Sequence, residues 1–443
     1  MGEQSKRPNV MTATQPAADT TDQYSISHQI VIVGGGSAGI TVAAQLLKQM
    51  RSLDILIIEP SEQHYYQPGW TLVGGGCISF EATVQPQQTL IPQDATWLQD
   101  KVVQFDPDQN CLHTQNGTQV TYDYLVVCPG IQINWNQIKG LQEALGKGEV
   151  CSNYAIGGAT HTWETIKRFQ GGNAIFTYPA TPIKCAGAPQ KIMYLADEAF
   201  GKNGVRKKTQ ISYCTATGKI FGVDAFVPAL MKVVERKGID LRTQHNLTEI
   251  RPDQKVALFA VSNGNETETI SLPYDMIHVT PPMSAPDVLK HSPLAVEGPG
   301  GWVDVDKFTT QHNRYPNIFS LGDASSLPTS KTAAAIRREA PVLVQNLLAH
   351  MNQTPLMGQY NGYSCCPLIT GYDKTILAEF DYEAQPYPSF PLDATKERTS
   401  MWLLKRHVLP WVYWNRMLKG KEHEGNFIRR LLPNTAFELS KKA

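Results

Sequence analysis

The 443-residue sequence has no net charge of either sign, because Lys plus Arg and Asp plus Glu each number 40. This balance gives no electrostatic reason to expect a nucleic-acid partner. No apolar run reaches the roughly 18 residues that a membrane-spanning helix needs. The chain also lacks a secretory signal, a C-x-x-C pair and the Cys/His spacing of a zinc site, so we expect neither export nor a bound metal.

Cysteine is sparse as well, with eight in the whole chain. We expect reduced thiols in a compartment that faces the cytosol, where any disulfide would be catalytic. Residues 1–27 are polar, poor in aromatics and without periodicity, which predicts a disordered tail. Lys6 and Arg7 are the only cations of this tail and acids are present, so it does not resemble a transit peptide.

A glycine-rich turn joins the first two strands that the sequence predicts, His28–Val33 and Leu53–Ile58. It reads Gly34-Gly-Gly36-Ser37-Ala38-Gly39 and opens a helix over 40–50. In such a motif the first glycine forms the tight turn, the second lets backbone N–H groups approach a pyrophosphate, and the third allows close helix–strand packing. Glu59 ends the second strand and is placed to bind a ribose. The motif predicts a dinucleotide site but does not separate FAD from NAD.

Two later strands favour a flavin. The segment 121–130 predicts a buried strand that ends in Gly130, and 317–323 predicts one that ends in Asp323. A carboxylate at this edge of a sheet is within reach of a flavin's ribityl hydroxyls. The aromatic, glycine-rich segment 62–76 suits close approach to a flavin face, although an ordinary packed turn would read the same way.

A second strand–turn–helix unit carries a cysteine where a nucleotide enzyme would carry a glycine motif. The strands are 173–177 and 209–215, and the helix spans 190–200. Pro189 removes an N–H that a phosphate cradle would use, which argues against an NAD(P)H site. Cys185 lies near the helix N-terminus beside Lys184, and both should lower its pKa. The alternative is that Cys185 is a small buried hydrophobe.

Two further segments are unusual. A strand-like stretch, 361–374, contains Cys365 and Cys366, of which only one can face a site because neighbours in a strand point to opposite faces. From Lys396 onward the chain is basic and rich in Trp and Tyr. This composition predicts amphipathic helices in a membrane interface, and the alternative is packing on the core or on a second subunit.

Five longer segments carry a family resemblance. They are His64-Tyr-Tyr-Gln-Pro-Gly-Trp70, Pro182-Ile-Lys-Cys185-Ala-Gly-Ala-Pro189, Val279-Thr-Pro-Pro-Met-Ser284, Leu327-Pro-Thr-Ser-Lys331-Thr332 and Cys366-Pro-Leu-Ile-Thr-Gly-Tyr372. The chain, over about 28–432, resembles the sulfide:quinone oxidoreductases of the branch that includes the mitochondrial enzymes. The resemblance implies a redox centre of Cys185 and Cys366. It also implies FAD contacts at the 34–39 loop (Gly34, Gly36, Ser37, Ala38 and Gly39), Glu59, Gln67, Val102, Gly130, Asp323 and Lys331.

The expected fold is α/β, with two Rossmann-like domains of the FAD/NAD(P)-binding type and a C-terminal amphipathic membrane-associating region. The expected divisions are a tail (1–27), the first part of the FAD domain (28–150), a second Rossmann-like domain with Cys185 but no working NAD site (151–285), a return to the FAD domain with the quinone and sulfide site (286–395), and membrane-binding helices (396–443).

The resemblance implies a resting Cys185–Cys366 bridge that hydrogen sulfide opens at Cys366, leaving a persulfide there and a thiolate at Cys185. Two electrons then pass through FAD to ubiquinone or plastoquinone. Glutathione, sulfite or another sulfide removes the sulfur, and a homodimer is compatible with this scheme. Because no transit peptide is recognised, we expect a peripheral protein on the cytoplasmic face of a bacterial inner or thylakoid membrane rather than in a mitochondrion.

Three rival hypotheses remain open at this point. A type II NADH:quinone dehydrogenase shares the fold, but it needs the missing second glycine motif and has no use for the two cysteines. An enzyme that passes sulfide electrons to a soluble cytochrome calls for a periplasmic signal. A flavin or sulfane-sulfur carrier without turnover would keep both cysteines but would have no purpose for a quinone-sized pocket.

Overall fold

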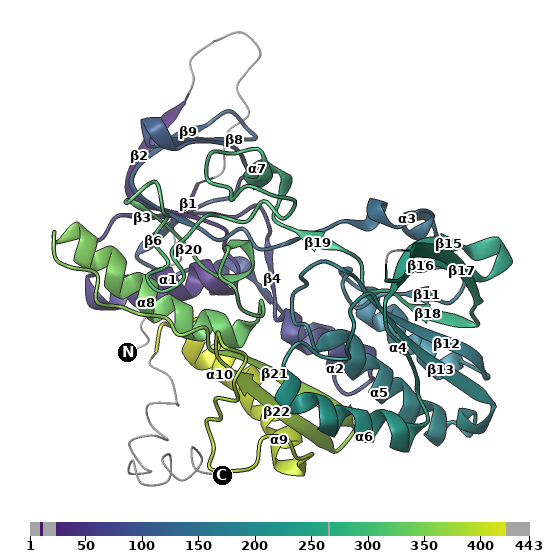
Figure 1. The fold of residues 1–443 in the computed structure, drawn as a ribbon. Helices are drawn as coiled ribbons and strands as arrows, with labels where there is room; N and C mark the ends of the chain where they lie inside the picture. The colour runs from purple at the N-terminus through teal and green to yellow at the C-terminus, as the bar shows by residue number, and fades with distance from the viewer. Residues whose placement is uncertain (1–8, 12–23, 265, 422–443) are drawn as a thin grey trace, which may run out of the picture.

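The computed structural model describes residues 9–11, 24–264 and 266–421. Two α/β units stand side by side, and the last part of the described chain packs beneath their junction (Figure 1). Each unit is built on its own sheet, as the alternation of buried strands and helices predicts.

The first sheet has the strand order β1-β6-β3-β2-β9-β8-β7, and β20 pairs with β9. Side chains of β2 alternate between two hydrophobic clusters, with Ile30 and Ile32 on the face covered by α1 and α8 and with Val31 and Val33 on the other face. The elements of this unit are β1 (Asn9–Met11), β2 (Ser25–Val33), α1 (Ser37–Gln49), β3 (Ile55–Ile58), β6 (Ala95–Leu98), β7 (Val102–Asp106), β8 (Cys111–Thr114), β9 (Gln119–Val127), α7 (Asp287–Lys290), β20 (Ile318–Ser320) and α8 (Ala333–Met351).

The second unit has a parallel sheet of order β11-β18-β12-β13-β14 beside a three-stranded antiparallel sheet, β15-β16-β17. Three predicted elements have nearly the expected bounds, namely β12, β13 and the helix after Cys185, here α5. The elements are α3 (Leu141–Ala144), β11 (Val150–Cys151), α4 (Gly158–Arg168), β12 (Gly172–Tyr178), α5 (Ala188–Lys202), β13 (Thr209–Thr215), α6 (Val227–Lys237), β14 (Asp240–Arg242), β15 (His245–Arg251), β16 (Val256–Asn263), β17 (Glu266–Pro273) and β18 (Met276–His278).

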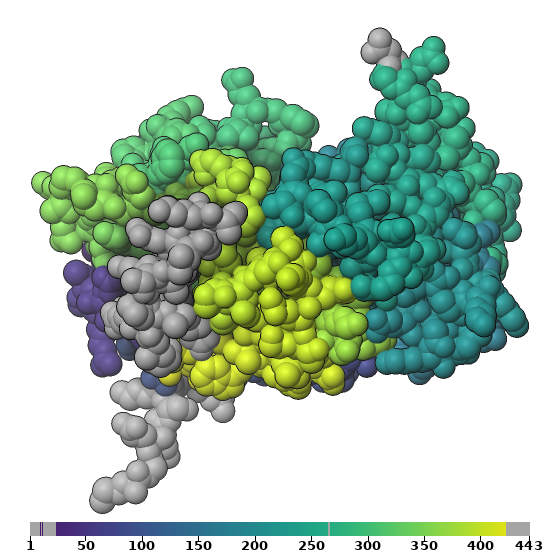
Figure 2. Space-filling view, turned by 60° about the horizontal axis from the view of Figure 1, so that its bottom comes forward, coloured from purple at the N-terminus to yellow at the C-terminus, as the bar shows by residue number. Residues whose placement is uncertain are grey.

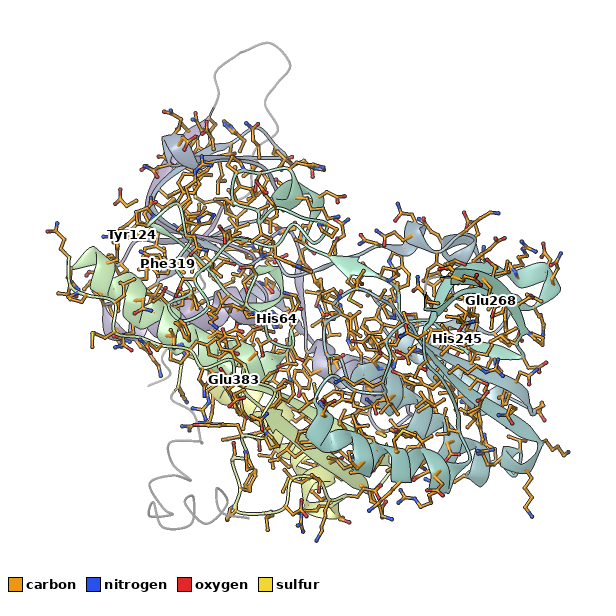
Figure 3. The ribbon with its side chains drawn as sticks, viewed as in Figure 1. His64, Tyr124, His245, Glu268, Phe319 and Glu383 are labelled. Carbon is orange, nitrogen blue, oxygen red and sulfur yellow. The ribbon has the colours of Figure 1, made fainter. Side chains whose placement is uncertain are left out.

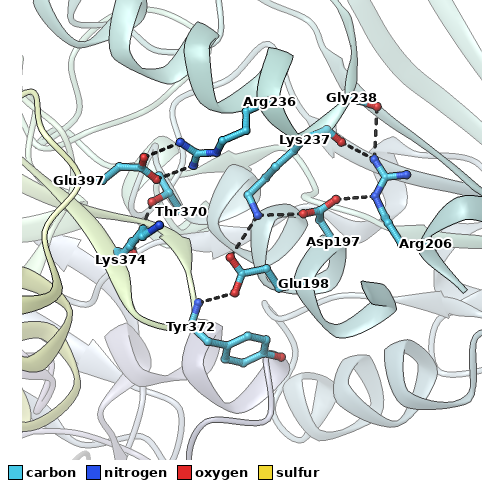
Figure 4. Close-up of polar contacts among 10 residues, drawn as sticks. All are labelled: Asp197, Glu198, Arg206, Arg236, Lys237, Gly238, Thr370, Tyr372, Lys374 and Glu397. Carbon is cyan, nitrogen blue, oxygen red and sulfur yellow. Dashed lines mark hydrogen bonds and ion pairs between the residues drawn. The ribbon is translucent and has the colours of Figure 1, made fainter. Parts of the chain in front are cut away.

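A hairpin of β21 (Ser364–Gly371) and β22 (Lys374–Phe380) joins the two units, because α5 and α8 both contact β21. Ion pairs link α6 to α5 and to the segment that follows the hairpin, and the Tyr372 N–H in the hairpin turn donates to Glu198 of α5 at 2.8 Å (Figure 4). Lys237 Nζ on α6 lies 2.8 Å from Asp197 and 3.2 Å from Glu198, both on α5. Arg236 donates to both carboxylate oxygens of Glu397, at 2.7 and 2.8 Å. Such a network fixes the helix that follows Cys185 relative to the strand that carries Cys366.

The C-terminal segment consists of α9 (Thr399–Leu403), a π-helical turn (404–408), α10 (Leu409–Val412) and a second π-helical turn (413–417). Figure 2 shows it in yellow as a continuous part of the surface between the two units. It is less exposed than an interfacial helix should be, because Trp402, Lys405 and Tyr413 are buried. Trp411 is 53 % exposed. The three buried residues therefore pack on the core, which is the alternative that the sequence left open, and residues 422–443 lie outside the described part of the chain.

Short elements connect the main ones, and two of them refine the sequence predictions. The predicted loop 62–76 contains a strand and a helix, and residues 9–11 of the predicted tail pair with β6. Thr332 caps α8, because its hydroxyl accepts a hydrogen bond from the Ala335 N–H at 3.0 Å. The remaining elements are β4 (Gln63–Tyr65), α2 (Trp70–Gly74), β5 (Val84–Pro86), β10 (Gln132–Ile133) and β19 (Met283–Ser284).

Candidate active site

A cavity of about 520 Å³ lies where the carboxyl ends of the first sheet meet the second unit and the C-terminal segment. Ten residues that the sequence predicted as site residues line it. They are Gly34, Gly36, Ser37, Ala38, Glu59, Gln67, Gly130, Cys185, Asp323 and Lys331. The C-terminal segment supplies one wall through Leu404, Lys405, Leu409, Val412, Tyr413 and Met417.

Each glycine of the first turn is required for a different structural reason. A Cβ at Gly34, whose φ is +104°, would overlap the Cys128 carbonyl, and one at Gly39 would overlap the Gly34 carbonyl. Gly36 and Gly130 have no atoms within 4 Å of such a Cβ. The turn is therefore closed on the protein side and open on the cavity side, where a pyrophosphate can approach the N-terminus of α1.

The acids and the lysine around this turn suit a dinucleotide cofactor. Glu59 accepts hydrogen bonds from the Gly35 and Ser61 N–H groups, both at 2.8 Å. Burial raises the pKa of Asp323, while the charges of Lys331 and Lys184 act in the opposite direction. The dinucleotide cofactor that the motif predicts fits these residues. There is open space at the glycines, a carboxylate stands at each predicted ribose or ribityl position, and a lysine lies beside Asp323.

The structure does not bring every predicted residue to the cavity wall. Val102 lies in β7, with its side chain buried in the cluster on the other face of the first sheet, beside a separate cavity of about 310 Å³. Gly39 serves packing behind the turn. Cys366 lies behind Cys185, within the hydrophobic cluster of the second unit.

Cys185 and Cys366 face each other as thiols, although they are 181 positions apart in the sequence. The hydrogen bond between them lowers the pKa of Cys185 well below its usual value and raises that of Cys366. Lys191 assists, because its Nζ donates to Cys185 Sγ at 3.1 Å. Cys185 has a left-handed backbone, with φ of +58°, and its N–H donates to the Lys331 carbonyl of the other unit at 2.8 Å. Cys365 points to the opposite face of β21, where it lines the cavity.

Three lysines besides Lys191 gather at the wall of this cavity. Burial lowers the pKa of Lys184 and of Lys331 to about 8, and that of Lys405 to about 7. Each ammonium has a partner: Lys184 donates to Gln67 Oε1 at 2.6 Å, Lys331 to the Ser325 carbonyl at 2.9 Å, and Lys405 to the Pro68 carbonyl at 2.9 Å. A set of this kind favours an anion in the cavity.

Sequence reasoning missed a chain of hydrogen bonds that ties the C-terminal segment to the glycine turn. The Tyr413 hydroxyl lies 2.6 Å from His64 Nε2 and 2.7 Å from Ser37 Oγ. Gln87 continues the chain, with its Oε1 3.3 Å from His64 Nδ1 and its amide donating to the Gly35 carbonyl at 2.7 Å. Burial lowers the pKa of His64, labelled in Figure 3, to about 4, so the ring is neutral at physiological pH. No local pattern signals contacts between positions hundreds of residues apart.

In the described part of the chain no helix is both long enough and apolar enough to cross a membrane. The described residues also contain no group of three or more His, Cys, Asp or Glu side chains that could hold a metal ion.

Comparison with known proteins gives consistent matches. The family model for pyridine nucleotide-disulphide oxidoreductases matches residues 28–157 and 186–345. The mitochondrial sulfide:quinone oxidoreductase of Mus musculus is 46 % identical over 405 residues, which covers 91 % of this chain and 89 % of the mouse protein. That of Dictyostelium discoideum is 45 % identical over 420 residues, covering 94 % of this chain and 92 % of the relative. The solved sulfide:quinone oxidoreductase of Aquifex aeolicus has a TM-score of 0.76 at 20 % identity, over 91 % of this chain and 94 % of that one, and so shares the fold.

These relatives overturn the expected location. Both full-length relatives are mitochondrial proteins, so the prediction of a bacterial inner or thylakoid membrane is wrong. The error came from the composition of residues 1–27, which was taken as evidence against a mitochondrial address.

The predicted α/β fold with two dinucleotide-type units is confirmed, and the matches favour the sulfide enzymes over the NADH dehydrogenases. Membership of the disulphide oxidoreductases implies a flavin cofactor. The chain belongs to the pyridine nucleotide-disulphide oxidoreductases and, within them, to the sulfide:quinone oxidoreductase family.

Proposed function

We propose that the chain is an FAD-dependent enzyme that oxidises hydrogen sulfide and transfers the two electrons to a quinone in the mitochondrial inner membrane. One observation carries this proposal: the hydrogen-bonded pair Cys185 and Cys366 stands beside a cavity that also contains the glycine turn. The family membership supports the same reading, because the relatives are named for sulfide and quinone.

We assign the FAD site to the residues that the motif and the cavity share. The N-terminus of α1, with Gly34 and Gly36, would hold the pyrophosphate, and Glu59 the adenosine ribose. Asp323 and Lys331 would hold the ribityl chain and the ring system, near the open space at Gly130. FAD, when bound, supplies a two-electron acceptor that can also reduce a quinone.

The residues of the chain handle the sulfur chemistry. In the proposed oxidised form, HS⁻ attacks Sγ of Cys366, the Cys185–Cys366 bond breaks, and the products are a Cys366 persulfide and the Cys185 thiolate. Charge and atoms balance, since one anion enters and one thiolate leaves. A low pKa at Cys185 makes it a good leaving group, and Lys191 stabilises the anion. A small nucleophile such as glutathione, sulfite or sulfide then removes the outer sulfur.

The apolar wall of the cavity suits a quinone. Leu404, Leu409, Val412 and Met417 line it from the C-terminal segment. On its outer side the same segment exposes three large apolar side chains, Leu403, Val408 and Trp411. We propose that this face contacts the membrane surface and that ubiquinone reaches the cavity from it.

An anaerobic titration tests the proposal. Purified holoprotein is mixed with sodium sulfide while the flavin spectrum is followed, and decyl-ubiquinone is then added. We expect bleaching by sulfide and recovery on addition of quinone, and neither in Cys185→Ser or Cys366→Ser. A flavin that ignores sulfide but bleaches with NADH would contradict the proposed function. A flavin that ignores both would leave only a carrier role.

A further inference from the structure

The second unit carries hydroxyl groups at the sheet edge where a nucleotide would bind in a two-dinucleotide enzyme. Ligands of parallel sheets bind at the carboxyl ends of the strands. Here Tyr178 ends β12, Tyr154 follows β11, and Thr280 follows β18. The Thr280 N–H donates to Thr177 Oγ1 at 3.0 Å, which holds the end of β18 against β12.

Two of these hydroxyls are buried without a partner. Tyr154 is 8 % exposed and Thr280 is 1 % exposed. The two groups face each other, yet neither hydroxyl makes a hydrogen bond of ordinary geometry with any described residue. Because a buried hydroxyl without a partner destabilises a fold, a ligand that bonds both hydroxyls would be stabilised at this place.

Tyr154 brings this pair near the two sulfurs. Tyr154 lines the cavity together with Cys185 and Lys184, and Lys184 Nζ is 5.8 Å from the centre of its ring. Burial, followed by the negative charge at Cys185, raises the pKa of Tyr154. Burial and the charges of both cysteines do the same for Tyr178. The tyrosines therefore keep their protons at neutral pH and are available near the sulfurs as hydrogen-bond donors.

We propose that Tyr154 and Thr280 form the binding site for the anionic sulfur, first for the HS⁻ that attacks Cys366 and then for the outer sulfur of the persulfide. This inference rests on the proposed function. A neutral hydroxyl pair with one lysine nearby suits a small, weakly hydrated monoanion better than a carboxylate or phosphate, which would call for bidentate cations. The hydroxyls act only by donating hydrogen bonds, and they leave the bond changes at Cys366 as written above.

The test compares variants that each remove one buried, unpartnered hydroxyl. Tyr154→Phe and Thr280→Val alter the proposed site, whereas Tyr274→Phe removes an equally buried and unpartnered hydroxyl in a different hydrophobic cluster of the same unit. Holoprotein is mixed rapidly with sodium sulfide under anaerobic conditions, and the rate constant of flavin reduction is measured against sulfide concentration. Reoxidation by decyl-ubiquinone and the melting temperature are measured on the same samples.

We expect the second-order rate constant with sulfide to fall at least tenfold in Tyr154→Phe, with a smaller fall in Thr280→Val and none in Tyr274→Phe. Reoxidation should stay within twofold, and the melting temperature should be unchanged or higher because an unpaired polar group has been removed. Rates in both site variants that match those of Tyr274→Phe would overturn this inference alone and assign the hydroxyls to bound water. A wild-type flavin that sulfide does not reduce would overturn the proposed function, and this inference with it.

Discussion

Replacement of Lys191 by methionine should raise the pKa of the Cys185 thiol. The ammonium donates to Cys185 Sγ at 3.1 Å, and Lys191 is buried. At an effective dielectric constant of about 20, Coulomb's law gives about 5 kcal/mol for unit charges at this distance, which corresponds to roughly four pKa units. Loss of the desolvation penalty of the lysine and the remaining hydrogen bond from Cys366 reduce the net effect, so we expect a rise of two to four units.

The assay is the pH dependence of iodoacetamide labelling of the fully reduced protein. Burial raises the pKa of Cys77, Cys151 and Cys214 to about 12, so these thiols should not react at neutral pH. Mass spectrometry of the labelled peptides then isolates the behaviour of Cys185. The midpoint of the profile is a better measure than a rate at one pH, because a thiolate of higher pKa is intrinsically more nucleophilic and partly compensates for its lower population.

Two further variants make the result interpretable. Lys191→Arg keeps the charge and should keep the midpoint within one unit. Lys202→Met removes an exposed lysine from the same helix and should not change the midpoint. The Nζ of Lys202 lies 3.8 Å from the centre of the Tyr372 ring. A Lys191→Met midpoint within half a unit of the wild type would refute the reasoning, since it would mean that the hydrogen bond from Cys366 alone sets the pKa.

Four other outcomes are expected. Burial raises the pKa of Glu339 from 4.5 to about 7, so the folded protein binds more protons than the unfolded protein between these pH values. The contribution of this carboxyl to the unfolding free energy is therefore fully present below pH 4.5 and should fall by about 3 kcal/mol as pH rises through 7. Urea melts at pH 5 and 8 should show this difference in the wild type and not in Glu339→Gln. Tyr413→Phe leaves His64 Nε2 without its partner and should lower the unfolding free energy by about 1–3 kcal/mol in urea melts, together with flavin affinity. Gly39→Val should yield protein without flavin, measured by absorbance after purification, because even a Cβ overlaps the backbone there. Trp411→Glu should at least halve cosedimentation with anionic liposomes at unchanged melting temperature, whereas undiminished binding would contradict the proposed membrane face.

The parts of the fold and site that local patterns encode were predictable. The glycine turn, the strand ends at Gly130 and Asp323, and the helix after Cys185 each follow from a few adjacent residues, and the structure has them close to the expected positions. Strand alternation also predicted that Cys365 and Cys366 point to opposite faces. The pairing of Cys366 with Cys185 came only from a family resemblance, because nothing in the spacing selects one of the other cysteines as the partner of Cys185.

The C-terminal segment shows where composition misleads. Aromatic and cationic residues in one short stretch predicted exposure, on the ground that they are hard to bury together. The structure buries Lys405, at 3 % exposure, because the Pro68 carbonyl accepts its hydrogen bond, and it buries Tyr413 because Ser37 and His64 satisfy its hydroxyl. Burial of a polar group depends on a partner that is distant in sequence, and composition carries no information about that partner.

The geometry at Cys185 links the two units to the chemistry. A residue other than glycine rarely adopts a left-handed backbone, and here the Cys185 N–H uses that conformation to donate to the Lys331 carbonyl, on the loop that leads into α8 of the first unit. The sulfur is thereby held by the first unit, by Lys191 of α5 and by Cys366 of the β21–β22 hairpin. Because α5 is in turn fixed to α6 by Lys237, and to the hairpin through Glu198 and the Tyr372 N–H, a shift of either unit would change the distance between the two sulfurs. The ion pairs of Figure 4 involve no residue that lines the cavity, and they help to fix the relative positions of the two cysteines.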